Sequence, residues 1–180
     1  MRSLTRDSVR DLLGAARAKG ERDWLMILIA FNHGLRASEV IALTAKDLAD
    51  GCVNVKRLKG SIHTIQPLRD CPEDPLFSER KATFDYVAKL NENQYLFPLT
   101  RQRFWQIVRE HGKAAGIPAH LCHPHILKHS IAMQTIHSAG VENLRTWLGH
   151  KTISSTGAYL NVSDEDASFA ISKALGPNPS

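Results

Sequence analysis

Apolar residues recur at helical spacing through most of this 180-residue chain, and one short stretch departs from that pattern. Val9, Leu12 and Leu13 illustrate the helical spacing, because residues three or four apart share one face of a helix. Between Cys52 and Leu68 the pattern changes to the alternation of apolar and polar residues that is typical of strands. The sequence therefore predicts a mainly α fold with a small antiparallel β-sheet, in the α+β class.

Local signals set the expected boundaries of these elements. Thr5 is expected to cap the first helix, and Gly34 to end the second in a left-handed turn. In the hairpin the apolar strand residues are Val53 and Val55, then Ile62 and Ile65, with Lys59-Gly60-Ser61 as the turn. Helices are predicted over 5–20, Arg22–His33, Ala37–Leu43, Ser78–Leu90, Thr100–Ala115, His125–Ala139 and Val141–Leu148, and in two short segments around Tyr159 and over Asp164–Leu175.

The length and the 43% hydrophobic content suit one compact domain. We expect residues 1–175 to form it and residues 176–180 to be a disordered tail. Neither an internal repeat nor a low-complexity linker divides the chain.

Charge and cysteine content restrict the partners and the compartment. The formal net charge of +5 favours a polyanionic partner, since clustered cations release counterions from phosphates. Cys52, Cys71 and Cys122 form no CxxC pair, which argues against a disulfide framework and fits a reducing cytoplasm. The longest apolar stretch, Trp24–Phe31, is too short to span a bilayer.

The segment from His123 to Leu160 carries the most chemical information. His125 and Lys128 lie three residues apart, so they share one helical face, which we expect to point outward. Tyr159 follows nine residues after His150. This spacing brings cationic and hydrogen-bonding groups close to a phenol in the sequence.

Four pieces of the chain, in order, resemble the tyrosine recombinase (phage integrase) family. Gly34-Leu35-Arg36-Ala37-Ser38-Glu39 is similar to its first arginine box, and Arg57-Leu58-Lys59-Gly60 before Pro67-Leu68 to its lysine hairpin. His125-Ile-Leu-Lys128-His129, followed by Leu148-Gly149-His150 and by Tyr159, resembles its second box. The resemblance covers nearly all of the chain from the second helix onward.

The resemblance implies a site-specific recombinase or integrase that cuts and rejoins double-stranded DNA through a 3′-phosphotyrosyl intermediate, without a metal or other cofactor. Tyr159 would be the nucleophile and Lys59 the general acid for the leaving oxygen. Arg36 and Lys128 would clamp the phosphate, His150 would donate a further hydrogen bond, and His125 would assist proton movement.

The family also suggests the setting in which such a domain works. Its members commonly carry a helical core-binding domain before the catalytic domain, and we expect that domain to be missing here. They act as homo-oligomers, commonly tetramers on two DNA duplexes. A prokaryotic, phage-borne or plasmid-borne cytoplasmic enzyme is therefore expected. The pattern of Ser163–Leu175 fits docking on a second protomer and packing on its own core equally.

Lys128 departs from the family pattern, in which this position is an arginine. Lysine keeps the charge but lacks the planar fork that grips two phosphate oxygens. An alternative function is therefore a DNA-binding module of the same fold with impaired or lost strand exchange, and Lys128→Arg is expected to raise cleavage. Within the class of enzymes, telomere resolvases and type IB topoisomerases are further alternatives, because they share the phosphotyrosine chemistry.

A metal site is the remaining alternative for the residues between 120 and 129. Histidines and a cysteine crowd within ten residues, and side chains of these types ligate zinc. Against it, no glutamate lies between the two helical histidines and no second ligand cluster exists in the sequence. The residues concerned are His120, Cys122, His123, His125 and His129.

Overall fold

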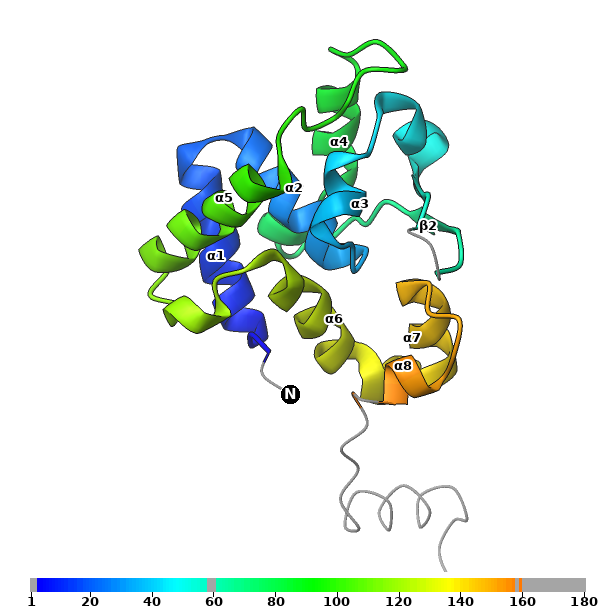
Figure 1. The fold of residues 1–180 in the computed structure, drawn as a ribbon. Helices are drawn as coiled ribbons and strands as arrows, with labels where there is room; N and C mark the ends of the chain where they lie inside the picture. The colour runs from blue at the N-terminus through cyan, green and yellow to red at the C-terminus, as the bar shows by residue number, and fades with distance from the viewer. Residues whose placement is uncertain (1–2, 58–60, 158, 160–180) are drawn as a thin grey trace, which may run out of the picture.

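A computed structural model describes residues 3–57, 61–157 and 159, and the fold is mainly helical with one two-stranded antiparallel sheet, as predicted (Figure 1). The α-helices are α1 Arg6–Lys19, α2 Glu21–Asn32, α3 Ala37–Ile41, α4 Arg80–Val87, α5 Arg101–Ala114, α6 Pro124–Ala139, α7 Val141–Leu148 and α8 Ser154–Gly157. Short 3-10 helices that the sequence analysis missed cover Ala45–Gly51, Pro75–Phe77 and Ala119–Leu121.

The helix boundaries follow from the capping residues. The Thr5 hydroxyl accepts a hydrogen bond from the backbone N–H of Ser8 at 3.1 Å, and Thr100 caps α5 in the same way. Gly34 has φ +57°, the left-handed conformation expected after α2, and a side chain there would meet Leu148. The cap at Thr5 and the turn at Gly34 are therefore confirmed.

Helix α2 forms the centre of the hydrophobic core. It contacts α1 on one side and α6 on another, and all residues from Trp24 to Asn32 are buried (Figure 1). The buried residues of this helix are therefore not confined to one face. A helix surrounded by others on all sides buries its whole circumference, and its apolar residues then extend all round.

The hairpin exposes a different face from the one its apolar residues suggest. Strands β1 (Cys52–Val55) and β2 (Thr64–Pro67) pair so that Val53 lies opposite Gln66 and Val55 opposite Thr64. All four of these residues are buried, whereas 66% of Ile65 is exposed. Polar residues point inward on β2 because they have buried partners: the oxygen of the Gln66 amide accepts a hydrogen bond from Nδ1 of His33 at 2.8 Å.

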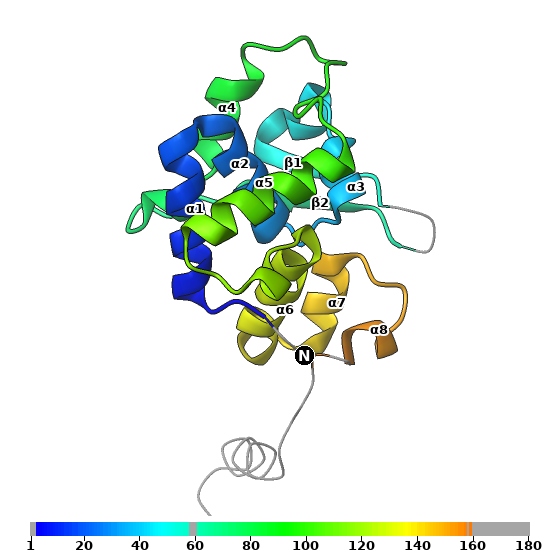
Figure 2. The same ribbon diagram turned by 60° about the vertical axis from the view of Figure 1, so that its left-hand side comes forward.

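The connection between the two strands returns against the end of α7. The backbone N–H of Ile62 donates to the carbonyl of Gly149 at 2.8 Å, and Ser61 pairs with His150 in an isolated antiparallel bridge. Gly149 has φ +68°, and a Cβ there would lie 2.7 Å from the Ile62 carbonyl oxygen. This close approach holds the hairpin against the end of α7 (Figure 2).

Several expectations fall on parts of the chain that are not described, the hairpin turn at Lys59-Gly60 among them. The helix expected over Asp164–Leu175 and the tail at 176–180 both lie outside the described residues. Among those that are described, no helix combines the length and the apolar character needed to cross a membrane.

Candidate active site

Five of the six residues predicted to form the site line one cavity. Arg36, His125, Lys128, His150 and Tyr159 surround a space of about 510 Å³. They come from the start of α3, from α6, from the end of α7 and from the segment after α8. The sixth residue, Lys59, lies outside the described residues. The fold thus brings together side chains that are more than a hundred residues apart in the sequence.

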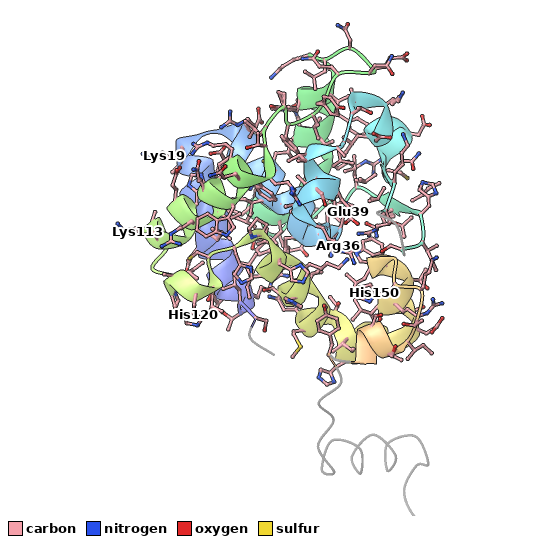
Figure 3. The ribbon with its side chains drawn as sticks, viewed as in Figure 1. Lys19, Arg36, Glu39, Lys113, His120 and His150 are labelled. Atoms are coloured by element: carbon pink, nitrogen blue, oxygen red, sulfur yellow. The ribbon has the colours of Figure 1, made fainter. Side chains whose placement is uncertain are left out.

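Arg36 is fixed at the entrance of this cavity by the first turn of α3. Its backbone N–H donates to Glu39 Oε2 at 2.8 Å, and its Nη1 donates to Glu39 Oε1 at 3.1 Å and to Ser61 Oγ at 3.2 Å. With 34% of its side chain exposed, the guanidinium has donors on Nε and Nη2 that bond to none of the described residues and can serve a ligand. Figure 3 labels Arg36 and Glu39 together, with His150 nearby.

Glu39 is buried beneath this arginine and also pairs with a second one. Arg57, whose side chain is fully buried, donates from Nη1 to Glu39 Oε2 at 3.1 Å. Burial raises the pKa of Glu39, but the backbone hydrogen bond at Arg36 and the charges of Arg57, Lys128 and Arg36 outweigh it and hold the pKa below its ordinary value. An ionised carboxylate therefore anchors the cations of the site.

Lys128 is buried, which corrects the expectation of an outward-facing edge on α6. Only 1% of it is exposed, and its ammonium donates to the carbonyls of Gly34 at 2.9 Å and Leu148 at 3.1 Å. These carbonyls stand at the ends of α2 and α7, where helical partners are lacking. Burial, followed by the charge of Arg57, lowers the pKa of Lys128 to about 7.

Lys128 is expected to make the free energy of unfolding rise with pH above 7. Its pKa is about 7 in the folded protein, whereas the ordinary lysine value of 10.5 applies to the unfolded chain. Between these two pH values the unfolded chain therefore binds more protons than the folded protein. Below pH 7 both states are protonated and the contribution is constant. Urea unfolding should give a slope of about 1 kcal/mol per pH unit that Lys128→Met removes. Equal slopes in the two proteins would contradict this assignment.

His150 reaches the cavity from the turn that ends α7. Its Nδ1 lies 3.0 Å from the hydroxyl of Thr156 in α8. Burial, followed by the charges of Lys128 and Arg36, lowers the pKa of His150 to about 4. The ring is therefore neutral at pH 7, with one N–H to donate.

Tyr159 directs its hydroxyl into the cavity and toward a histidine. Its oxygen lies 3.0 Å from Nδ1 of His129, and 5% of the residue is exposed. Burial raises the pKa of this phenol, and the charge of Arg36 opposes that effect. The ring of His125 lies edge-on to that of His129, with 4.3 Å between the centroids.

His129 and Arg57 are parts of the site to which the sequence analysis gave no role in DNA cleavage, although His129 was among the candidate metal ligands. His129 follows Lys128 directly and lies one helical turn after His125, so the spacing could have placed it on the same face. Arg57 precedes the hairpin turn, but no feature of the sequence distinguishes a buried arginine from a solvated one.

A wider groove continues from the cavity along α5. It measures about 720 Å³, shares Arg36 and His125 with the cavity, and is lined by Arg101, Gln102 and Trp105 of α5. Trp105 is partly exposed, and the guanidinium of Arg109 lies 5.0 Å from its ring centroid. Cations beside an exposed aromatic ring are suited to a phosphate backbone.

The structure also bears on the alternative metal site. Within residues 3–57, 61–157 and 159, no group of three or more His, Cys, Asp or Glu side chains is arranged to hold a metal ion. His120, one of the crowded histidines, is labelled on the opposite side of the molecule from Arg36 and His150 (Figure 3).

Comparison with known proteins gives a family and relatives that agree with one another. The profile of the phage integrase family matches residues 2–166. The type 1 fimbriae regulatory protein FimE of Escherichia coli strain K12 is 31% identical over 175 residues, which cover 88% of this chain and 84% of FimE. The tyrosine recombinase XerD of Bradyrhizobium diazoefficiens is 31% identical over 168 residues, which cover 86% of this chain and 53% of XerD.

A solved structure supports the same grouping at the level of the fold. The XerH site-specific recombinase bound to its difH substrate, in a pre-cleavage complex, matches with a TM-score of 0.74 and 18% identity. The match covers 94% of this chain and 53% of the XerH chain. The chain thus spans about half the length of XerD and XerH, and the fold expected from the resemblance is confirmed.

Proposed function

Because the chain belongs to the phage integrase family, we propose that it is a tyrosine recombinase that cleaves and rejoins double-stranded DNA through a 3′-phosphotyrosyl intermediate. The observation that carries the proposal is the single cavity that Tyr159 lines together with Arg36, Lys128 and His150. No nucleotide cofactor is needed as an energy source, because the covalent link conserves the energy of the broken phosphodiester bond.

In the proposed reaction the Tyr159 oxygen attacks the phosphorus and the bond to the 5′ oxygen breaks. Negative charge then grows on the nonbridging oxygens, and fixed donors must stabilise it. The free donors of Arg36 and the N–H of neutral His150 are suited to that task. Lys128 lies behind the turn that presents Arg36, and its Nζ holds that turn by donating to the carbonyl of Gly34.

The leaving 5′ oxygen requires a proton, which we assign to Lys59. The residues that flank the undescribed segment support this role, because Arg57 is buried beside Glu39 and Ser61 accepts a hydrogen bond from Arg36. Rejoining reverses the step: the 5′ hydroxyl attacks the phosphotyrosine, and the tyrosine oxygen leaves.

The groove along α5 is the proposed path of the DNA backbone. Arg101 lies at its wall, and the groove opens into the cavity beside Arg36. His125 lines both spaces and so would lie next to the scissile phosphate. Exchange between two duplexes requires four strand cleavages, each with its own tyrosine, and we therefore propose a homotetramer on DNA.

Covalent capture tests the function without a known target sequence. The protein is incubated with a pool of nicked suicide duplexes of randomised sequence, and complexes that survive denaturant are collected. We expect a slowly migrating band that protease removes. DNA that is retarded in a native gel but never linked covalently would instead support the alternative, a DNA-binding module in which Lys128 has replaced a catalytic arginine.

A further inference from the structure

The hydroxyl of Tyr159 has a specific partner in the cavity, and that partner is not His125. Nδ1 of His129 lies 3.0 Å from the phenolic oxygen, and the two ring centroids are 5.6 Å apart. In the described residues no hydrogen bond joins His125 to Tyr159; its ring instead packs edge-on against His129. We propose that His129 is a catalytic residue that accepts the phenolic proton of Tyr159 as the tyrosine attacks DNA, a role that rests on the proposed function.

The surroundings of His129 keep its ring neutral and ready to accept a proton. Burial, followed by the neighbouring rings of His125 and His123 and the charge of Lys128, lowers the pKa of His129 to about 4. A neutral imidazole has one unprotonated nitrogen, and here Nδ1 faces the phenol. The proposed role requires that the hydroxyl donates to Nδ1 and that the ring keeps its hydrogen on Nε2.

The proton moves only when phosphate is present, because a base this weak does not ionise a free phenol. A DNA phosphate beside Arg36 brings negative charge near the ring, which favours the imidazolium form. As the bond from the Tyr159 oxygen to phosphorus forms, the proton passes to Nδ1, and the 5′ oxygen leaves with a proton from the general acid. In the rejoining step the imidazolium returns its proton to the tyrosine oxygen.

His129→Asn separates proton transfer from positioning. The asparagine amide reaches the place of Nδ1 and keeps a hydrogen bond to the hydroxyl, but it takes up no proton. We expect cleavage of captured suicide duplex to fall about 100-fold at neutral pH and to recover as pH rises, because hydroxide then ionises the phenol. His137→Asn, an exposed histidine of the same helix, is the matched control and should cleave like the native protein.

A sulfur leaving group identifies which proton is affected. In a duplex with a 5′-bridging phosphorothiolate the thiolate leaves without protonation, so variants that impair the general acid regain their rate. The defect of His129→Asn is expected to persist on this duplex and that of Lys59→Ala to disappear. Rescue of His129→Asn by sulfur, cleavage at the native rate, or a defect that does not vary with pH would each overturn the role of His129.

A measurement on the native protein without DNA distinguishes a failure of this inference from a failure of the proposed function. Long-range proton–nitrogen NMR spectra at pH 6.5 should show His129 neutral, with hydrogen on Nε2 and none on Nδ1. Hydrogen on Nδ1 would overturn the inference even if the protein cleaves DNA. Failure of the native protein to form any covalent complex would overturn the proposed function, whatever state the ring is in.

Discussion

Tyr159→Phe is expected to abolish covalent capture of DNA completely while leaving DNA binding within about threefold of the native affinity. The change removes a single oxygen, the atom that would form the bond to phosphorus. The ring is buried, so phenylalanine retains its packing against the core. His129 loses one hydrogen-bond partner but stays neutral. Gels run in denaturant measure the covalent complex, and native gels measure binding.

Tyr95→Phe is the matched control for this prediction. Tyr95 is not among the residues that line the cavity, and its side chain is exposed. Its loss should leave both gels unchanged. Covalent capture by Tyr159→Phe at even a tenth of the native level would mean that another residue attacks the phosphate.

Arg57→Met is expected to lower the free energy of unfolding by about 3 kcal/mol. Besides its ion pair with Glu39, the Arg57 guanidinium donates to the carbonyls of Gly34, His33 and Trp147 at 3.2, 3.2 and 2.9 Å. Methionine fills much of the space but donates no hydrogen bond. Removing one member of a buried ion pair takes away part of the compensation of the other, here the Glu39 carboxylate, and such changes are among the costliest single substitutions.

Lys56→Met provides the comparison at the neighbouring position. Lys56 also forms an ion pair, with Asp47 at 3.3 Å, but 70% of its side chain is exposed. Exposed pairs contribute little, so the free energy of unfolding should change by less than about 1 kcal/mol. Similar losses in the two variants, measured by urea unfolding, would contradict the buried role assigned to Arg57.

The helices were predictable from the sequence because their signals are local. Thr5 and Thr100 precede α1 and α5 as capping residues, and Gly34 and Gly149 adopt the left-handed turns that end α2 and α7. A cap satisfies groups within three residues of itself, so the necessary information lies in a short window. The helix expected over 100–115 agrees closely with α5 for this reason.

Burial of polar groups was not predictable, because it depends on partners from distant parts of the chain. Lys128 looked like an exposed residue next to His125, yet the carbonyls that hold its ammonium belong to residues 34 and 148. On β2 the apolar residue Ile65 is exposed, and the inward position belongs to Gln66, whose partner His33 lies in another element. The spacing of polar and apolar residues usually indicates which side chains are exposed and which are buried. At these positions the polar residues are buried and the apolar one is exposed.

The identity of the site followed from motif order, whereas its internal contacts did not. Five of the predicted residues meet at one cavity, but spacing alone did not indicate that His129 rather than His125 faces the phenol. Residues 125 and 129 both lie on one face of α6, and only the position of Tyr159 distinguishes them. That position depends on how the chain turns after α8.

The central claim is that Tyr159 attacks a phosphate held in this cavity, and mapping of the covalent adduct tests it most directly. The captured complex is trimmed with nuclease and digested with trypsin, and the modified peptide is sequenced by mass spectrometry. The account predicts a nucleotide attached through its 3′ phosphate to Tyr159. A nucleotide on Tyr86, on Tyr95 or on a serine, or a link through the 5′ phosphate, would contradict it.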